Sequence, residues 1–159
     1  MEQVPSSPNV TAPALAPRPA PTATRRIAGG LVAAAVLAVL GLAAWLRPSP
    51  SGIGTHLQLG LMQCGWVSAF GKPCPTCGMT TSFAHAAHGH LERAVAAQPM
   101  GAALALASAA AFWIGLHVAV TGSDLGRVCG NLLRPRVLWL LAAAAGVAWA
   151  YKLVVWRQP

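Results

Sequence analysis

The stretch Cys64-Gly-Trp-Val-Ser-Ala-Phe-Gly-Lys-Pro-Cys74-Pro-Thr-Cys77-Gly-Met-Thr-Thr81 decides how this chain can fold. It contains three of the four cysteines, and it lies in the long polar interval between two strongly apolar segments. The fourth, Cys129, stands alone in a later basic loop, where we expect a free thiol. We therefore expect the rest of the chain to hold this stretch beside a membrane.

The composition of the whole chain is that of a membrane protein. Of the 159 residues, 55% are hydrophobic and only 9% are charged, whereas a soluble domain has about 25% charged residues. The net charge is +8, and the Lys and Arg residues lie at the ends of apolar runs. This pattern indicates a lipid bilayer, and not nucleic acid, as the partner of the positive charge.

Three apolar runs are each long enough to cross a bilayer as a helix. About 20 residues, at a rise of about 1.5 Å each, span a hydrocarbon core of about 30 Å. We predict spans at about residues 27–46, 100–120 and 137–155, with Lys152 reaching out to the headgroups near the end of the third. A signal peptide is the alternative for the first run, but that run exceeds the usual length of about 7–15 residues. An uncleaved anchor is therefore favoured.

The domain organisation follows from these spans. Residues 1–24 are rich in Pro and Ala and offer little apolar bulk, which predicts a disordered tail. Residues 25–159 form a single membrane domain, and residues 55–98 supply its cysteine-rich loop and an interfacial helix. The fold class is an all-α membrane protein with three transmembrane helices.

The basic residues also predict an orientation. Arg25 and Arg26 precede the first span, and the side with the most Lys and Arg is usually cytoplasmic. A cytoplasmic N-terminus places six of the eleven basic residues inside and the cysteine stretch outside. We expect a bacterial inner (plasma) membrane protein.

The segment Met79–Gln98 has the pattern of one amphipathic helix at the membrane surface, interrupted near Gly89. Its polar stripe has the helical spacing i, i+4, i+7 and i+11, and is formed by Thr81, His85, His88 and Glu92. We expect these four side chains to face water.

The Cys74-Pro75-Thr76-Cys77 motif predicts a helix start. Proline is favoured at the first helical position, so Cys74 would be the N-cap and Cys77 would lie in the first turn. The positive end of the helix dipole would then lower the pKa of both thiols.

Three interpretations of the cysteines remain open. A disulfide from Cys64 to Cys74 or Cys77 would be a structural clip worth about 3 kcal/mol. Cys74 and Cys77 could instead form a redox-active pair. Finally, Cys64, Cys74 and Cys77 could hold zinc, with His56 or a water as the fourth ligand. His85 would lie about 12 Å from Cys77 along a continuous helix, which is too far to join that site.

The motif also resembles a known family. Cys64, the run Gly71-Lys-Pro-Cys-Pro-Thr-Cys-Gly-Met-Thr80, His88-Gly89 and Gln98-Pro99 before a span are similar to the DUF2752 family. The resemblance extends over about Gly52–Val155. It implies a small bacterial membrane protein with a Cys-Pro-x-Cys-Gly-x-Thr-Arg signature, whose matching residues here include Pro75, Gly78 and Thr80. The final Arg is replaced by Thr81 here, and the family implies no activity.

The sequence supports two hypotheses about the function of the protein. The sequence contains no carboxylate pair, phosphate-binding glycine loop or nucleophile triad, which argues against an enzyme. The favoured hypothesis is a structural or accessory module whose cysteine junction presents the interfacial helix to lipid, a membrane protein partner or a second copy. The alternative is a membrane thiol-disulfide oxidoreductase that uses Cys74 and Cys77.

Overall fold

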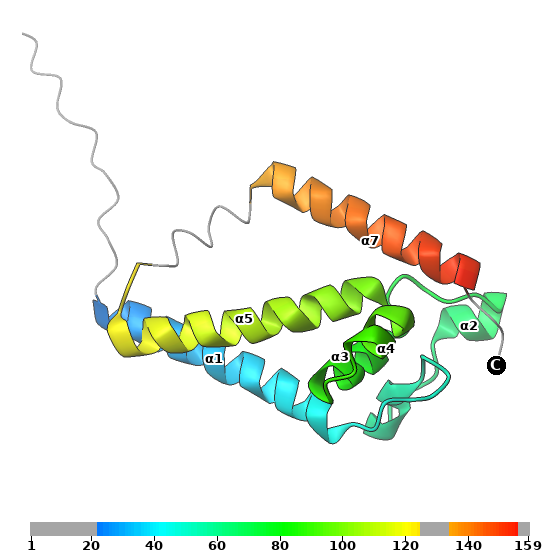
Figure 1. The fold of residues 1–159 in the computed structure, drawn as a ribbon, viewed down its shortest axis with the longest axis horizontal. Helices are drawn as coiled ribbons and strands as arrows, with labels where there is room; N and C mark the ends of the chain where they lie inside the picture. Colours follow the sequence, from blue (N-terminus) through cyan, green and yellow to red (C-terminus); the bar gives the residue numbers. More distant parts are fainter. Residues whose placement is uncertain (1–21, 125–133, 156–159) are drawn as a thin grey trace, which may run out of the picture.

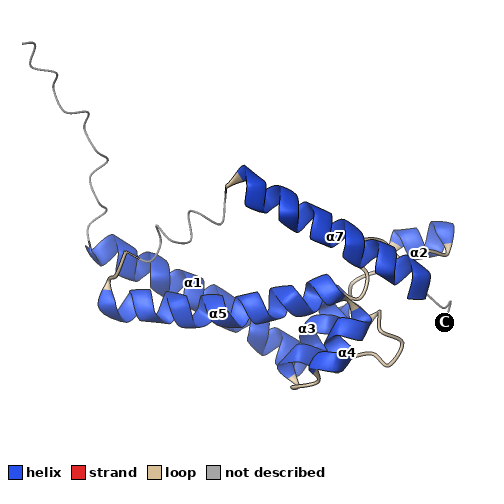
Figure 2. Cartoon of the chain, turned by 45° about the horizontal axis from the view of Figure 1, so that its top comes forward, coloured by secondary structure: helices blue, strands red, loops and turns tan. Residues whose placement is uncertain are grey.

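The computed structural model describes residues 22–124 and 134–155, and these residues form helices joined by loops (Figure 2). In chain order the elements are α1 (Thr22–Trp45), the 3₁₀ helix η1 (Thr55–Leu59), α2 (Gly65–Phe70), α3 (Met79–Ala87), α4 (Leu91–Ala97), α5 (Pro99–Thr121) and α7 (Pro135–Val155). The prediction of an all-α fold is confirmed for the described part of the chain.

Three helices are long and apolar enough to cross a membrane, which confirms the prediction of three candidate spans. They are α1, α5 and α7, with 24, 23 and 21 residues. Helix α1 begins at Thr22, so the last three residues assigned to the tail belong to its first turn. The rest of the predicted tail and Cys129 lie outside the described residues.

Helices α1 and α5 lie side by side (Figure 1), and small residues allow their close approach. A Cβ atom at Gly29 would lie only 2.8 Å from the carbonyl oxygen of Gly115, and one at Gly115 would lie 3.0 Å from that of Gly29. Four residues after each glycine, Ala33 and Ala119 also have short side chains. This is the small-xxx-small arrangement with which membrane helices associate closely.

The short helices gather where α1 ends and α5 begins (Figure 1). Helices α3 and α4 replace the single predicted interfacial helix, and the turn between them contains Gly89 with a φ of 79°. The interruption was expected there. The expected exposure of the polar stripe is wrong in part, because Thr81 is 1% exposed and His85 is 8% exposed. Helix α3 packs against α1, α4 and α5, so this face meets other helices instead of water.

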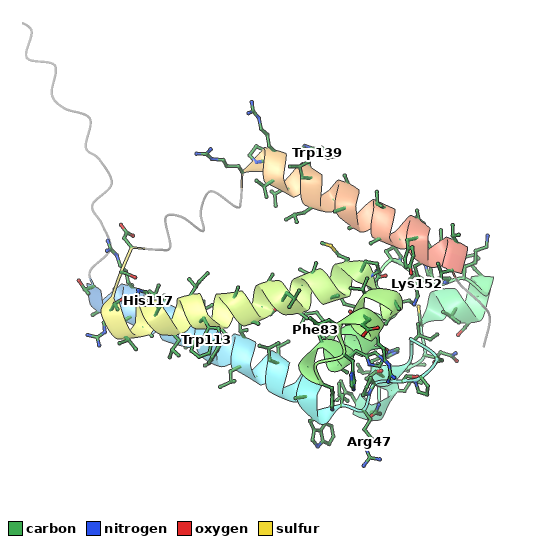
Figure 3. The ribbon with its side chains drawn as sticks, viewed as in Figure 1. Arg47, Phe83, Trp113, His117, Trp139 and Lys152 are labelled. Atoms are coloured by element: carbon green, nitrogen blue, oxygen red, sulfur yellow. The ribbon has the colours of Figure 1, made fainter. Side chains whose placement is uncertain are left out.

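Helix α7 reaches the same group of short helices with its C-terminal part. The Trp149 Nε1–H donates to the Pro73 carbonyl at 3.2 Å, and the Lys152 ammonium donates to the Ala97 carbonyl at 2.6 Å. Figure 3 shows Lys152 near the end of α7. Because Lys152 is only 7% exposed, the prediction that its side chain extends outward from the helix end is wrong. The side chain turns inward, where Ala97 offers a hydrogen-bond acceptor.

The spans alternate in direction, which separates the two ends of the molecule. Arg25 at the start of α1 forms an ion pair of 3.7 Å with Asp124, which follows α5. The cysteine stretch lies at the other end, between the end of α1 and the start of α5. A cytoplasmic N-terminus remains a prediction from the positions of the basic residues.

The α1–α5 contact provides a first prediction. Gly29→Ala places a Cβ atom 2.8 Å from the Gly115 carbonyl oxygen, whereas a Cβ atom at Gly41, also inside α1, meets nothing within 4 Å. Both variants replace a helical glycine with alanine and gain the same helix propensity. The difference between their free energies of unfolding therefore reports the contact alone. We expect Gly29→Ala to be less stable than Gly41→Ala by about 1–3 kcal/mol, measured by unfolding in detergent followed by circular dichroism. Equal stability of the two variants would contradict the close contact.

Candidate functional site

The candidate site is a cluster of three thiols. The Sγ atoms of Cys64, Cys74 and Cys77 all lie within 4.8 Å of one another, and those of Cys74 and Cys77 are 3.2 Å apart. All three side chains are free thiols; Cys77 is buried, and the other two are half-buried. Among the described residues, this is the group of His, Cys, Asp and Glu side chains that is arranged to hold a metal ion.

Cys74 and Cys77 lie in a turn that is separate from the following helix. The Cys77 N–H donates to the Cys74 carbonyl at 3.0 Å, and the Met79 N–H donates to the Thr76 carbonyl at 3.1 Å. Gly78 is the N-cap of α3, with a left-handed φ of 87°. The predicted capping role of Cys74, and the place of Cys77 in the first turn, are therefore wrong. The left-handed residue interrupts the helical path, so α3 starts only at Met79.

Cys64 has the helix-capping position that was expected for Cys74. It is the N-cap of α2, a helix that sequence reasoning missed because six residues are too few to show a helical period. The one residue in the sequence that could have indicated the end of this helix is Gly71, which has a left-handed φ of 63° at the C-cap of α2. The nearby Val67 backbone N–H favours the thiolate and lowers the pKa of the Cys64 thiol to about 7.

The pKa of Cys77 is shifted in the opposite direction. Burial, together with the neighbouring Cys74 and Cys64 thiols, raises the pKa of Cys77 to about 12. The expectation of a lowered pKa at Cys77 is therefore wrong, because desolvation outweighs the Cys74 backbone hydrogen bond that favours the thiolate. At neutral pH, Cys64 has much more thiolate character than Cys77.

The cluster opens into a cavity of about 530 Å³. His56, Thr80 and Thr81 line this cavity together with the three cysteines. The His56 Nε2 atom lies 3.3 Å from the Met62 carbonyl oxygen, and His56 is outside the group of converging ligand atoms. The structure thus brings together three of the four residues proposed for zinc and places the fourth on the wall of the same cavity.

Buried hydrogen bonds hold the cysteine turn in place. The Thr55 and Thr81 hydroxyls are 2.8 Å apart, so Thr81 links α3 to η1. The Gln98 side-chain amide donates to the Pro75 carbonyl at 2.9 Å. The Ser82 hydroxyl lies 2.8 Å and 3.0 Å from the carbonyl oxygens of Ala94 and Gln98. Sequence reasoning missed the burial of Thr55, Ser82 and Gln98, since each has its partner in a different segment.

The fold and the site together define a small helical protein with three candidate membrane spans and a three-cysteine cluster at one end. The family described as "Protein of unknown function (DUF2752)" matches residues 64–113. The resemblance is thereby confirmed over a stretch that contains the three clustered cysteines and the first part of α5. No curated protein and no solved structure matches the chain.

Gly78 provides a prediction about how the site is assembled. A Cβ atom there would lie 2.8 Å from the Gly52 carbonyl oxygen and 2.9 Å from that of Ala97. Gly60 has a similar left-handed φ of 72°, but its Cβ atom would meet nothing within 4 Å. Both Ala variants carry the strain of that conformation, about 1–2 kcal/mol. We expect Gly78→Ala to cost about 1–3 kcal/mol more than Gly60→Ala in detergent unfolding; equal costs would refute the crowding.

The opposite pKa shifts predict the order in which the thiols react. In reduced, chelator-treated protein, a maleimide should label Cys64 before Cys77, because the thiolate is the reactive form. The rate at Cys64 should rise with pH and level off above about 7, while Cys77 stays slow across that range. Peptide mapping by mass spectrometry measures both rates in one sample. Equally fast labelling of Cys77 would contradict its burial.

Proposed function

We propose that the protein is a structural or accessory membrane module whose cysteine cluster binds a thiophilic metal ion, most simply zinc, through Cys64, Cys74 and Cys77. One observation carries the proposal: three Sγ atoms from two separate segments converge within 4.8 Å. A disulfide joins only two sulfur atoms, whereas a tetrahedral metal ion uses all three and leaves one position open.

The distances suit such a site after a small adjustment. Zinc–sulfur bonds of about 2.3 Å in a tetrahedral arrangement place neighbouring sulfur atoms about 3.8 Å apart. Cys74 and Cys77, now 3.2 Å apart, would separate by about 0.6 Å. The fourth ligand would come from the cavity side, where His56 and water are the available donors. This matches the donor set expected from the sequence.

Metal binding would also account for the electrostatics of the cluster. A buried thiol with a pKa of about 12 has little tendency to ionise by itself, but a bound cation deprotonates a coordinating thiol. Binding would release protons, so the affinity for zinc should increase as the pH rises.

The role of the metal would be to clamp the short helices. Cys64 begins α2, and the Cys74–Cys77 turn leads into α3, so one ion would join these two helices. Trp66 of α2 contacts Trp149 of α7 edge to face, with ring centroids 6.2 Å apart. The clamp would therefore stiffen the whole end of the molecule that faces a lipid or protein partner.

A thiol-disulfide oxidoreductase is the second candidate, and the 3.2 Å approach of Cys74 and Cys77 favours it. In that reaction a cluster thiolate would attack the disulfide of a partner protein and release one partner thiolate. A second cluster thiol would then displace the other, leaving a disulfide here and a reduced partner. The shifts in pKa favour attack by Cys64 over attack by Cys77.

The metal content of the purified full-length protein distinguishes these candidates. We expect about one zinc ion per chain, by native mass spectrometry and elemental analysis, with loss of the metal in Cys64→Ser and Cys77→Ser. Cys129→Ser removes the fourth thiol of the sequence and should keep the zinc. Metal-free protein about two mass units lighter, with two blocked cluster thiols, would refute the metal site. A mixed disulfide trapped on Cys74→Ser would then identify the oxidoreductase.

A further inference from the structure

A second cavity, of about 710 Å³, has a strongly basic wall. His85 from α3, Arg93 from α4 and Lys152 from α7 line it, and Ser51 and Gly52 contribute from the segment after α1. None of the three clustered cysteines is on this wall. The residues argued here are therefore not among the proposed metal ligands, although Ser51 lies on the walls of both cavities.

The positive charge of this cavity has no counter-ion within the described residues. Lys152 donates to the Ala97 carbonyl, a neutral acceptor, which leaves two of its three N–H groups available. The described carboxylates, Glu92 and Asp124, form no ion pair with Lys152 or Arg93. A cation with so little exposure is costly unless an anion or several hydrogen bonds compensate it.

His85 adds an unused hydrogen-bonding group. Its side chain is buried, and the Nδ1 atom has no hydrogen-bond partner. Buried polar atoms almost always have a partner, so the enclosed and unpaired Nδ1 atom of a residue that lines the cavity points to a missing partner. Burial, and next the charge of Arg93, lower the pKa of His85, so the neutral imidazole offers a hydrogen bond without adding charge.

We propose that this cavity binds a phosphate group, with Lys152 and Arg93 providing the charge and His85 a neutral hydrogen bond. The position of the cavity favours the headgroup of an anionic phospholipid as the source. Lys152 and Val155 lie in the last turn of a candidate span, and the neighbouring Val154 is 86% exposed in the manner of a lipid-facing residue. Basic pockets at the ends of membrane helices bind acidic headgroups in this way.

The test measures phosphatidylglycerol binding to the full chain in neutral detergent by native mass spectrometry. Arg93→Gln removes one charge from the wall, and because Arg93 is exposed this variant should keep its fold. Lys72→Gln is the matched control, since Lys72 is an exposed cation in the cysteine stretch that is not on this wall. We expect Arg93→Gln to weaken binding roughly tenfold, and Lys152→Gln at least as much. Lys72→Gln should bind like the unchanged protein.

A second arm separates the two sources of phosphate. Inorganic phosphate is titrated into the same proteins and followed by calorimetry. Binding of the lipid alone, with the expected order of variants, identifies the headgroup; binding of inorganic phosphate with the same order supports the site and identifies a soluble anion. Equal binding by the unchanged protein, Arg93→Gln and Lys72→Gln, or no binding of either probe, would overturn the proposal. The zinc content of Arg93→Gln should be unchanged, which would show that its weaker binding does not result from a loss of metal at the cysteine cluster.

Discussion

Several chain segments approach one another closely at Gly78, and the arrangement of the site follows from this contact. The carbonyl oxygens of Gly52 and Ala97 would lie within 3 Å of a side chain at this position. The Lys152 Nζ atom would be 3.3 Å away. Gly78 also needs its left-handed φ of 87° to join the cysteine turn to α3. The space left by one missing Cβ atom thus allows the loop after α1, the end of α4, the cysteine turn and α7 to meet.

Around this point, hydrogen bonds take the place of a large apolar core. The buried hydrophobic residues of the described chain are mostly alanines, while Thr55, Thr81, Ser82 and Gln98 are almost completely buried. Most large apolar side chains of α1, α5 and α7 are exposed, as expected for helices in lipid. The short helices can therefore bury little apolar surface, and a metal clamp would supply stability that their packing cannot.

The two cavities meet at this junction. Ser51 lies on both walls, and Gly78, on the wall of the cysteine cavity, is adjacent to the Lys152 ammonium of the basic cavity. Zinc bound by three thiolates would carry one net negative charge. That charge would lie close to Lys152, so the proposed metal and the proposed phosphate group would share one electrostatic environment.

The features that depend on local composition and length could be predicted from the sequence. Three long apolar runs predicted α1, α5 and α7, and the spacing of the cysteines and the position of Gly89 marked the junction and the break between α3 and α4. Which polar groups are buried depends instead on contacts between distant segments. Thr81 shares a hydrogen bond with the Thr55 hydroxyl, 26 residues away along the chain, and Lys152 donates to the Ala97 carbonyl, 55 residues away. These partners allow both side chains to be enclosed. No local pattern encodes such distant partners. Side chains that were expected to face water or the headgroups are therefore buried in the site instead.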